Sequence, residues 1–218
     1  MYGFDTPLNP EQGCGRIGSY TEMLPLKEVN AMPKKMPVAA LKKQLKALSQ
    51  QEMISLICSL YQSCPDAANI LSAKFSGQDF VKGLLAESKE KIEKEFSGQG
   101  MKGPSLSKAK KVISDFKKVS PAPEDVLELK LHYAECVAEF GSSFGDIPES
   151  FYDSLENVYS DVVSSLNKLG SEELFTAFYP RLKSIIREVD GLGYGISDGL
   201  SFVLEDELEW KPEDEESQ

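Results

Sequence analysis

The stretch LSKAKKVISDFKKVSPAPEDVLELKLHYAECVAEFGSSFGDIPESFYDSLENVYSDVVSSLNKL, residues 106–169, contains three helical patterns separated by helix breakers. Its first part repeats apolar residues with the i, i+3, i+4, i+7 spacing of one buried helix face: Ala109, Val112, Ile113 and Phe116. The prolines of SPAP at 120–123 end this helix, and residues 124–140 form the next one. The sequence DIPE at 146–149 begins a third, whose apolar residues are Phe151, Leu155, Val158, Val162, Leu166 and Leu169.

The helical pattern extends outward on both sides of this stretch. On the N-terminal side, Leu41, Leu45 and Leu48 mark a short helix, and SQQE at 49–52 is a capping box that opens another. On the C-terminal side, Pro180 predicts a kink or break, and residues 196–209 form a last helix. No segment alternates convincingly with period two. We therefore predict an all-α fold, a single domain of about eight to nine helices packed as consecutive antiparallel pairs.

The predicted domain covers residues 37–209, with a different composition at each end. Residues 1–36 combine prolines and glycines without a sustained period, which is typical of an irregular, mobile leader. Met32 and Met36 lie at the end of this leader. A start at either methionine is an alternative, in which the native protein does not contain residues 1–31 or 1–35. Residues 210–218 form an acidic tail.

Charge is distributed unevenly along the chain. Residues 34–118 carry 16 Lys and 8 Asp or Glu, whereas residues 119–218 carry 6 Lys or Arg and 23 Asp or Glu. The domain thus has a basic half, 37–118, and an acidic half, 119–209. This split indicates either two partners or two halves that attract each other, within one molecule or between copies. The net charge of −11 disfavours nucleic acid as a partner of the whole molecule.

Other features point to a cytoplasmic location without membrane contact. No apolar run approaches the roughly 18–20 residues that a bilayer span requires. The four cysteines (Cys14, Cys58, Cys64 and Cys136) are scattered, as expected for reduced thiols in a cytosolic protein. The N-terminus also lacks the charged and apolar regions of a secretory signal.

Two stretches together resemble an uncharacterised family of bacterial all-α proteins with a conserved domain of unknown function. They are LKKQLKALSQQEMISLICSLYQ at 41–62 and the segment from LSKAKK to FYDSLE at 106–156. The resemblance covers most of residues 38–200, including GLGYGISD, and leaves out the leader. It implies an all-α fold and brings with it no activity, ligand or catalytic residue.

The single histidine lies on a helical line of acidic residues. Glu128, His132, Glu135 and Glu139 are spaced 4, 3 and 4 apart, and the following helix carries a second line, Glu149, Asp153 and Glu156. If the two lines faced each other, their carboxylates would need a cation between them. The seven residues are therefore the candidate ligands of a divalent cation, an alternative to the simpler interpretation of two solvated helix faces.

A lysine-rich segment at 102–118 is the other candidate binding element. Its lysines spread around the polar side of a helix and do not gather on one face with aromatic residues, which favours a solvated surface over a weak nucleic-acid site. No catalytic or cofactor-binding residue is predicted. We expect a non-enzymatic protein that interacts with another protein or with itself.

Overall fold

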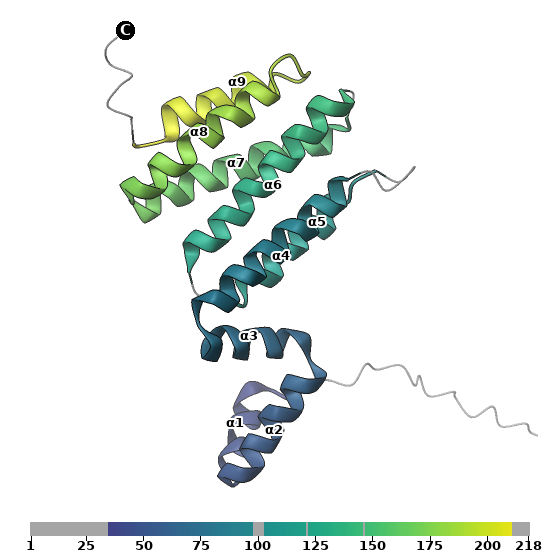
Figure 1. Ribbon diagram of the computed structural model, residues 1–218, viewed down its shortest axis with the longest axis vertical. Helices are drawn as coiled ribbons and strands as arrows, with labels where there is room; N and C mark the ends of the chain where they lie inside the picture. Colours follow the sequence, from purple (N-terminus) through teal and green to yellow (C-terminus); the bar gives the residue numbers. More distant parts are fainter. Residues whose placement is uncertain (1–34, 98–102, 121, 146, 211–218) are drawn as a thin grey trace, which may run out of the picture. The chain divides into compact units, whose positions relative to one another are not determined.

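The computed structural model describes residues 35–97, 103–120, 122–145 and 147–210 (Figure 1). These residues form helices without any strand, as the sequence predicts. The helices are α1 (Val38–Lys46), α2 (Gln50–Ser63), α3 (Pro65–Ser76), α4 (Gln78–Phe96), α5 (Leu106–Lys117), α6 (Pro123–Phe144), α7 (Glu149–Leu169), α8 (Glu172–Glu188) and α9 (Ile196–Phe202). None of them is long and apolar enough to cross a bilayer. The leader at 1–36 lies outside the described residues except for its last two.

The chain divides into two compact units, Met1–Ser49 and Gln50–Gln218. The first contains α1, whose residues are all exposed apart from the half-buried Leu45. The second contains α2 to α9. The sequence predicts that the domain starts at residue 37. The boundary between the two units lies further along the chain, after α1.

Helix α6 is the centre of the second unit. It packs against α4, α5, α7 and α8, and Figure 1 shows it between the α4–α5 pair and α7. Because neighbours cover it on several sides, apolar residues are buried around most of its circumference, including Leu127, Leu129, Leu131 and Val137. The pairs α4–α5 and α6–α7 consist of consecutive helices, as predicted.

Buried hydroxyl groups join the central helices. The Tyr133 hydroxyl of α6 lies 2.6 Å from Oγ of Ser154 in α7, and the Tyr159 hydroxyl donates to the Leu182 carbonyl of α8 at 3.3 Å. Both rings are fully buried, so these bonds satisfy polar atoms that water cannot reach.

Pro180 does not break its helix, contrary to one of the two outcomes that the sequence predicts. Helix α8 runs from Glu172 to Glu188 with Pro180 inside it. Phe175, Phe178 and Leu182 bury one face of α8 on both sides of the proline, and this packing holds the helix together. Thr176, whose carbonyl loses its usual partner four residues on, is exposed to water.

The C-terminal segment also differs from the single helix predicted at 196–209. Helix α9 ends at Phe202 and continues as a π-helical turn, Val203–Glu207. Asn167 of α7 holds the end of this turn, donating to the Glu207 carbonyl at 2.7 Å and accepting from the Glu209 N–H at 3.1 Å. Trp210 then stacks on Phe175, with ring centroids 5.6 Å apart, so packing extends one residue into the predicted tail.

Helices α2 and α3 contribute no buried residue to the core. Figure 1 shows α3 turning back sharply from the end of α2, with only Cys64 between them. Several large apolar side chains of the two helices are exposed: Ile54, Leu56, Ile57, Leu60, Tyr61, Ile70 and Phe75. Stability of the second unit therefore depends mainly on α4 to α9.

This difference predicts unequal effects of two matched truncations. Replacing fully buried Leu131 with alanine should lower the free energy of unfolding by about 2–5 kcal/mol, because it leaves a cavity in the core. The same change at exposed Leu60 should lower it by less than about 1 kcal/mol. Urea unfolding followed by circular dichroism measures both, and equal losses would contradict this description of the core.

Candidate functional site

An alternating chain of charged groups crosses the surface formed by α4, α6 and α8. The Arg181 guanidinium of α8 donates a hydrogen bond from Nη1 to Oε2 of Glu128 at 2.7 Å. It also donates two hydrogen bonds to Glu135, from Nε to Oε1 at 2.7 Å and from Nη2 to Oε2 at 2.8 Å. Lys89 of α4 pairs with the other oxygen of Glu128. Two bonds to one carboxylate fix the orientation of both groups.

These contacts change the acid–base properties of the two carboxylates. Burial alone would raise the pKa of Glu135, but hydrogen bonds from Arg181 and His132 outweigh it and lower the pKa to about 2. The pKa of Glu128 is lowered in the same way, as Arg181 and Lys89 outweigh the effect of burial. Burial would lower the pKa of Arg181, but the two carboxylates raise it above its ordinary value. All three groups are therefore charged at neutral pH.

His132 extends this chain of charges back to α4. Its Nε2 lies 3.0 Å from Oε1 of Glu93, and its Nδ1 lies 3.6 Å from Oε2 of Glu135. The same Nε2 lies 3.8 Å from Sγ of Cys136, one helical turn further along α6. The histidine is thus placed between two carboxylates and a thiol.

The structure does not bring the two acidic lines together. Glu128 and Glu135 bind cations from α4 and α8, whereas Glu156 of α7 lies beside Gly199 of α9, where an added Cβ would be 3.1 Å from its Oε1. Glu149 and Asp153 are exposed on α7, and Glu139 is exposed on α6. Among the described residues, no group of three acidic, histidine or cysteine side chains is arranged to hold a metal ion. The cation beside Glu128 and Glu135 is a guanidinium.

Sequence reasoning missed three members of this network: Lys89 and Glu93 of α4, and above all Arg181 of α8. Arg181 lies 46 and 53 positions after its two partners, and no local pattern links it to them. The acidic line on α6 was visible in the sequence, but a cation was predicted only between it and the acidic line on α7. The helix that supplies the guanidinium was not identified.

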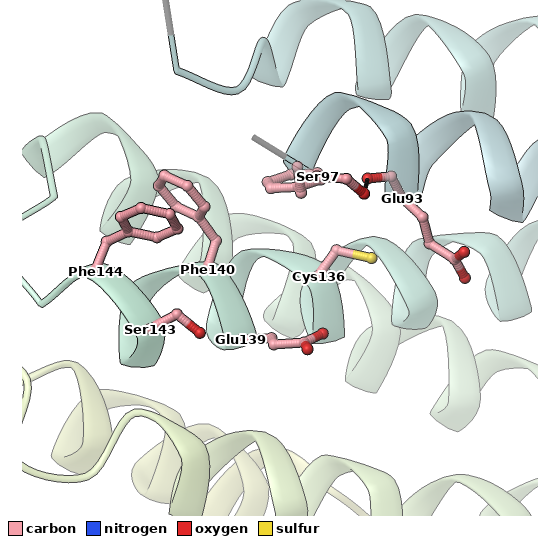
Figure 2. Close-up of a pocket in the computed structure, with 8 residues that line it drawn as sticks. Glu93, Ser97, Cys136, Glu139, Phe140, Ser143 and Phe144 are labelled. Carbon is pink, nitrogen blue, oxygen red and sulfur yellow. Dashed lines mark hydrogen bonds between the residues drawn. The ribbon is translucent and has the colours of Figure 1, made fainter. Parts of the chain in front are cut away.

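A cavity of about 310 Å³ lies between α4 and α6, next to this network (Figure 2). Figure 2 shows Cys136 and Glu139 on one helix and Glu93 on the other, with the rings of Phe140 and Phe144 at the far end. The remaining lining residues are Phe96, Ser97 and Ser143. Phe140 packs tightly against Phe144, with ring centroids 4.5 Å apart. The cavity is therefore aromatic at one end and acidic at the other.

Cys136 and His132 form a close cysteine–histidine pair, but the thiol is not activated. Burial raises the pKa of Cys136 to about 12, and the negative charges of Glu93, Glu139 and Glu135 add to this effect. Nucleophilic cysteines need the opposite, a thiolate stabilised by nearby positive charge. At neutral pH this cysteine remains a protonated thiol.

The lysine-rich segment is partly neutralised within its own surroundings. Lys111 and Lys118 both bind Asp115, and together they lower the pKa of that carboxyl to about 2. Lys108 lies 3.7 Å from Glu95 of α4, and Lys110 lies over the Tyr133 ring. Lys102 is outside the described residues.

Comparisons with models of protein families, with curated protein sequences and with solved structures found no match to this chain. The resemblance of residues 41–62 and 106–156 to a bacterial family of unknown function therefore stays a prediction. Functional interpretation depends on the residues themselves.

The Arg181 network predicts a defined pH dependence of stability. The pKa of Glu135 is about 2 in the folded protein against 4.5 for an unperturbed carboxyl, so its contribution is complete above pH 4.5 and is lost as the pH falls toward 2. Arg181→Met should lower the free energy of unfolding by about 1–3 kcal/mol at neutral pH, because two half-buried carboxylates lose their partner. It should also flatten the acid limb of the stability curve.

Arg187→Met is the matched control, because Arg187 is an exposed arginine on the same helix. Urea unfolding at a series of pH values measures both variants. If Arg181→Met retained the acid dependence of the parent protein, another group would be responsible for it.

The raised pKa of Cys136 predicts slow modification by thiol reagents. Iodoacetamide should label exposed Cys58 much faster than Cys136 in the folded protein at pH 7–8. Because the Cys136 pKa is about 12, its labelling rate should still be rising at pH 10, without a plateau. Mass spectrometry of peptides after timed quenching measures each site, and rapid labelling of Cys136 at neutral pH would contradict an unactivated thiol.

Proposed function

We propose that this chain is a non-catalytic, cytoplasmic protein–protein interaction module and that the α2–α3 pair is its docking surface. The observation that carries the proposal is the exposure of apolar residues along both helices. The free thiols Cys58, Cys64 and Cys136 support the location, since reduced cysteines are typical of the cytoplasm.

The apolar residues of α2 form a continuous surface. Its large apolar side chains span roughly 160° of the helix circumference at 100° per residue: Met53, Ile54, Leu56, Ile57, Leu60 and Tyr61. Helix α3 covers part of this arc, and five of the six side chains remain exposed. Single exposed apolar residues are normal on soluble proteins, whereas a contiguous group marks an interaction site.

Interactions within the chain support a non-catalytic role. Arg181 is bound to two carboxylates, His132 contacts Glu93 and Glu135, and Cys136 is held as a thiol. The groups best suited to acid–base or nucleophilic chemistry are thus engaged with each other at neutral pH.

Two alternatives from the sequence remain weaker proposals. A divalent cation would compete with Arg181 and Lys89 for Glu128 and Glu135. A nucleic acid would compete with Asp115 and Glu95 for the lysines of α5. Neither alternative has a structural observation as direct as the exposed face of α2–α3.

A pair of charge-matched variants tests the docking surface. Leu60→Glu places a carboxylate in the apolar arc of α2, and Ser55→Glu adds the same charge on the opposite side of that helix. We expect proteins captured from nuclease-treated host lysate by the full chain to be lost with Leu60→Glu and retained with Ser55→Glu. Circular dichroism confirms that each variant is folded. Loss of capture with both variants, or with neither, would contradict the proposal.

A further inference from the structure

The docking surface carries a protruding ring beside a hollow. A cavity of about 370 Å³ lies between α2 and α3, lined by Ile57, Cys58, Tyr61, Gln62, Leu71, Ser72, Phe75 and Ser76. Phe75 stands at its edge with 79% of its surface exposed, the largest exposed fraction among the large apolar side chains of the described residues. The hydroxyl oxygens of Tyr61 and Ser72, one from each helix, lie 3.5 Å apart in the lining of the cavity.

This combination makes the surface complementary to itself. In a two-fold symmetric pair, residue i of one copy contacts residue j of the other, and residue j contacts residue i. A ring and a hollow on the same face meet this condition, because rotation about the axis brings each ring opposite the other hollow. A flat apolar face would not fix the position of one copy relative to the other.

The charge of the surface is compatible with self-association. Residues 50–76 contain only three charged side chains, Glu52, Asp66 and Lys74. Two copies of this segment therefore meet without strong like-charge repulsion. A charge-poor, apolar surface is also more typical of homodimers than of transient contacts between different proteins.

The area is sufficient for a modest dimer. At 1.5 Å per residue, α2 and α3 are each about 20 Å long, and with a helix diameter of about 10 Å each presents a strip of roughly 20 by 10 Å. Counting both copies and the roughness of the side chains, such a contact buries on the order of 1,000 Å², near the lower limit for a specific interface. We expect a dimer that dissociates at micromolar concentrations.

We infer that the occupant of the proposed docking surface is a second copy of this chain. Two α2–α3 pairs pack face to face about a two-fold axis, and each copy inserts Phe75 into the cavity of the other. The inference rests on the docking surface proposed above and adds the identity and geometry of the partner.

Sedimentation velocity of the full chain over a range of concentrations tests the dimer. We expect a monomer–dimer equilibrium that Phe75→Ala weakens at least tenfold, as for an interface residue that carries more than about 1.4 kcal/mol. Phe202→Ala, which removes an exposed phenylalanine from α9, is the matched control and should leave the equilibrium unchanged. A chain that stays monomeric up to about 100 μM, or equal effects of both variants, would overturn the inference.

A mixing experiment tests the reciprocal insertion. Ser72→Trp fills the cavity and leaves Phe75 in place, whereas Phe75→Ala removes the ring from the edge of the cavity and leaves the other lining residues in place. Each variant alone should dimerise weakly. An equimolar mixture should associate more strongly than either, because one ring then finds one open cavity. If the mixture behaved as the average of its components, reciprocal insertion would be wrong.

Salt dependence separates this dimer from attraction between the basic and acidic halves of the chain. An apolar contact between two copies of net charge −11 should be unchanged or strengthened by added salt, because salt screens their repulsion. Weakening by salt would instead indicate pairing of the two halves and would overturn the inference. If the chain stays monomeric while Leu60→Glu still abolishes capture, the proposed docking surface is supported and the inference that a second copy occupies it is wrong.

Discussion

The pairing of Arg181 with Glu128 and Glu135 is the constraint on which the arrangement of the second unit depends. Helix α6 packs against four other helices, and its Glu128 and Glu135 carboxylates are half-buried where these helices meet. Half-buried carboxylates without a partner would be strongly unfavourable. One guanidinium from α8, supported by Lys89 of α4, satisfies them and connects three helices that are far apart in the sequence. Buried apolar area supplies most of the stability, while this network adds directional contacts from α8 and α4 to α6.

Within the second unit, the surface of α2 and α3 is more apolar than the surface of α4 to α9. From α4 to α9, the buried side-chain nitrogen and oxygen atoms have hydrogen-bond partners, and among the described residues only Phe144, Tyr194 and Phe202 are exposed large apolar side chains. Along α2 and α3 the apolar residues remain exposed in water. Covering this surface would stabilise the protein, because each apolar side chain that becomes fully buried contributes about 1.5–3 kcal/mol. The proposed docking surface is thus separate from the residues that determine stability, and substitutions in one need not disturb the other.

Local patterns predicted the helices well, because the i, i+3, i+4 spacing of residues such as Ala109, Ile113 and Phe116 reflects burial directly. They also identified the acidic line on α6, but they predicted a cation beside it only if the acidic line on α7 faced it. They could not identify Arg181 as that cation, since its position opposite Glu135 depends on how two long helices cross. The continuity of α8 through Pro180 was equally hidden, because it depends on the packing of Phe175, Phe178 and Leu182. The exposure of α2 was hidden for the same reason: its apolar arc looks like a core-facing stripe until its neighbours are known.

The stacking of Trp210 on Phe175 has a consequence for how this protein can be observed. The chain contains a single tryptophan, and that residue lies at the end of the segment that Asn167 holds in place. Intrinsic tryptophan emission therefore reports on the attachment of residues 207–210 to α7 and α8, and not on the central helix. Circular dichroism, by contrast, averages over all helices. The two signals form a natural pair of optical probes, and the separation between their transitions measures how tightly release of the C-terminal segment is coupled to melting of the core.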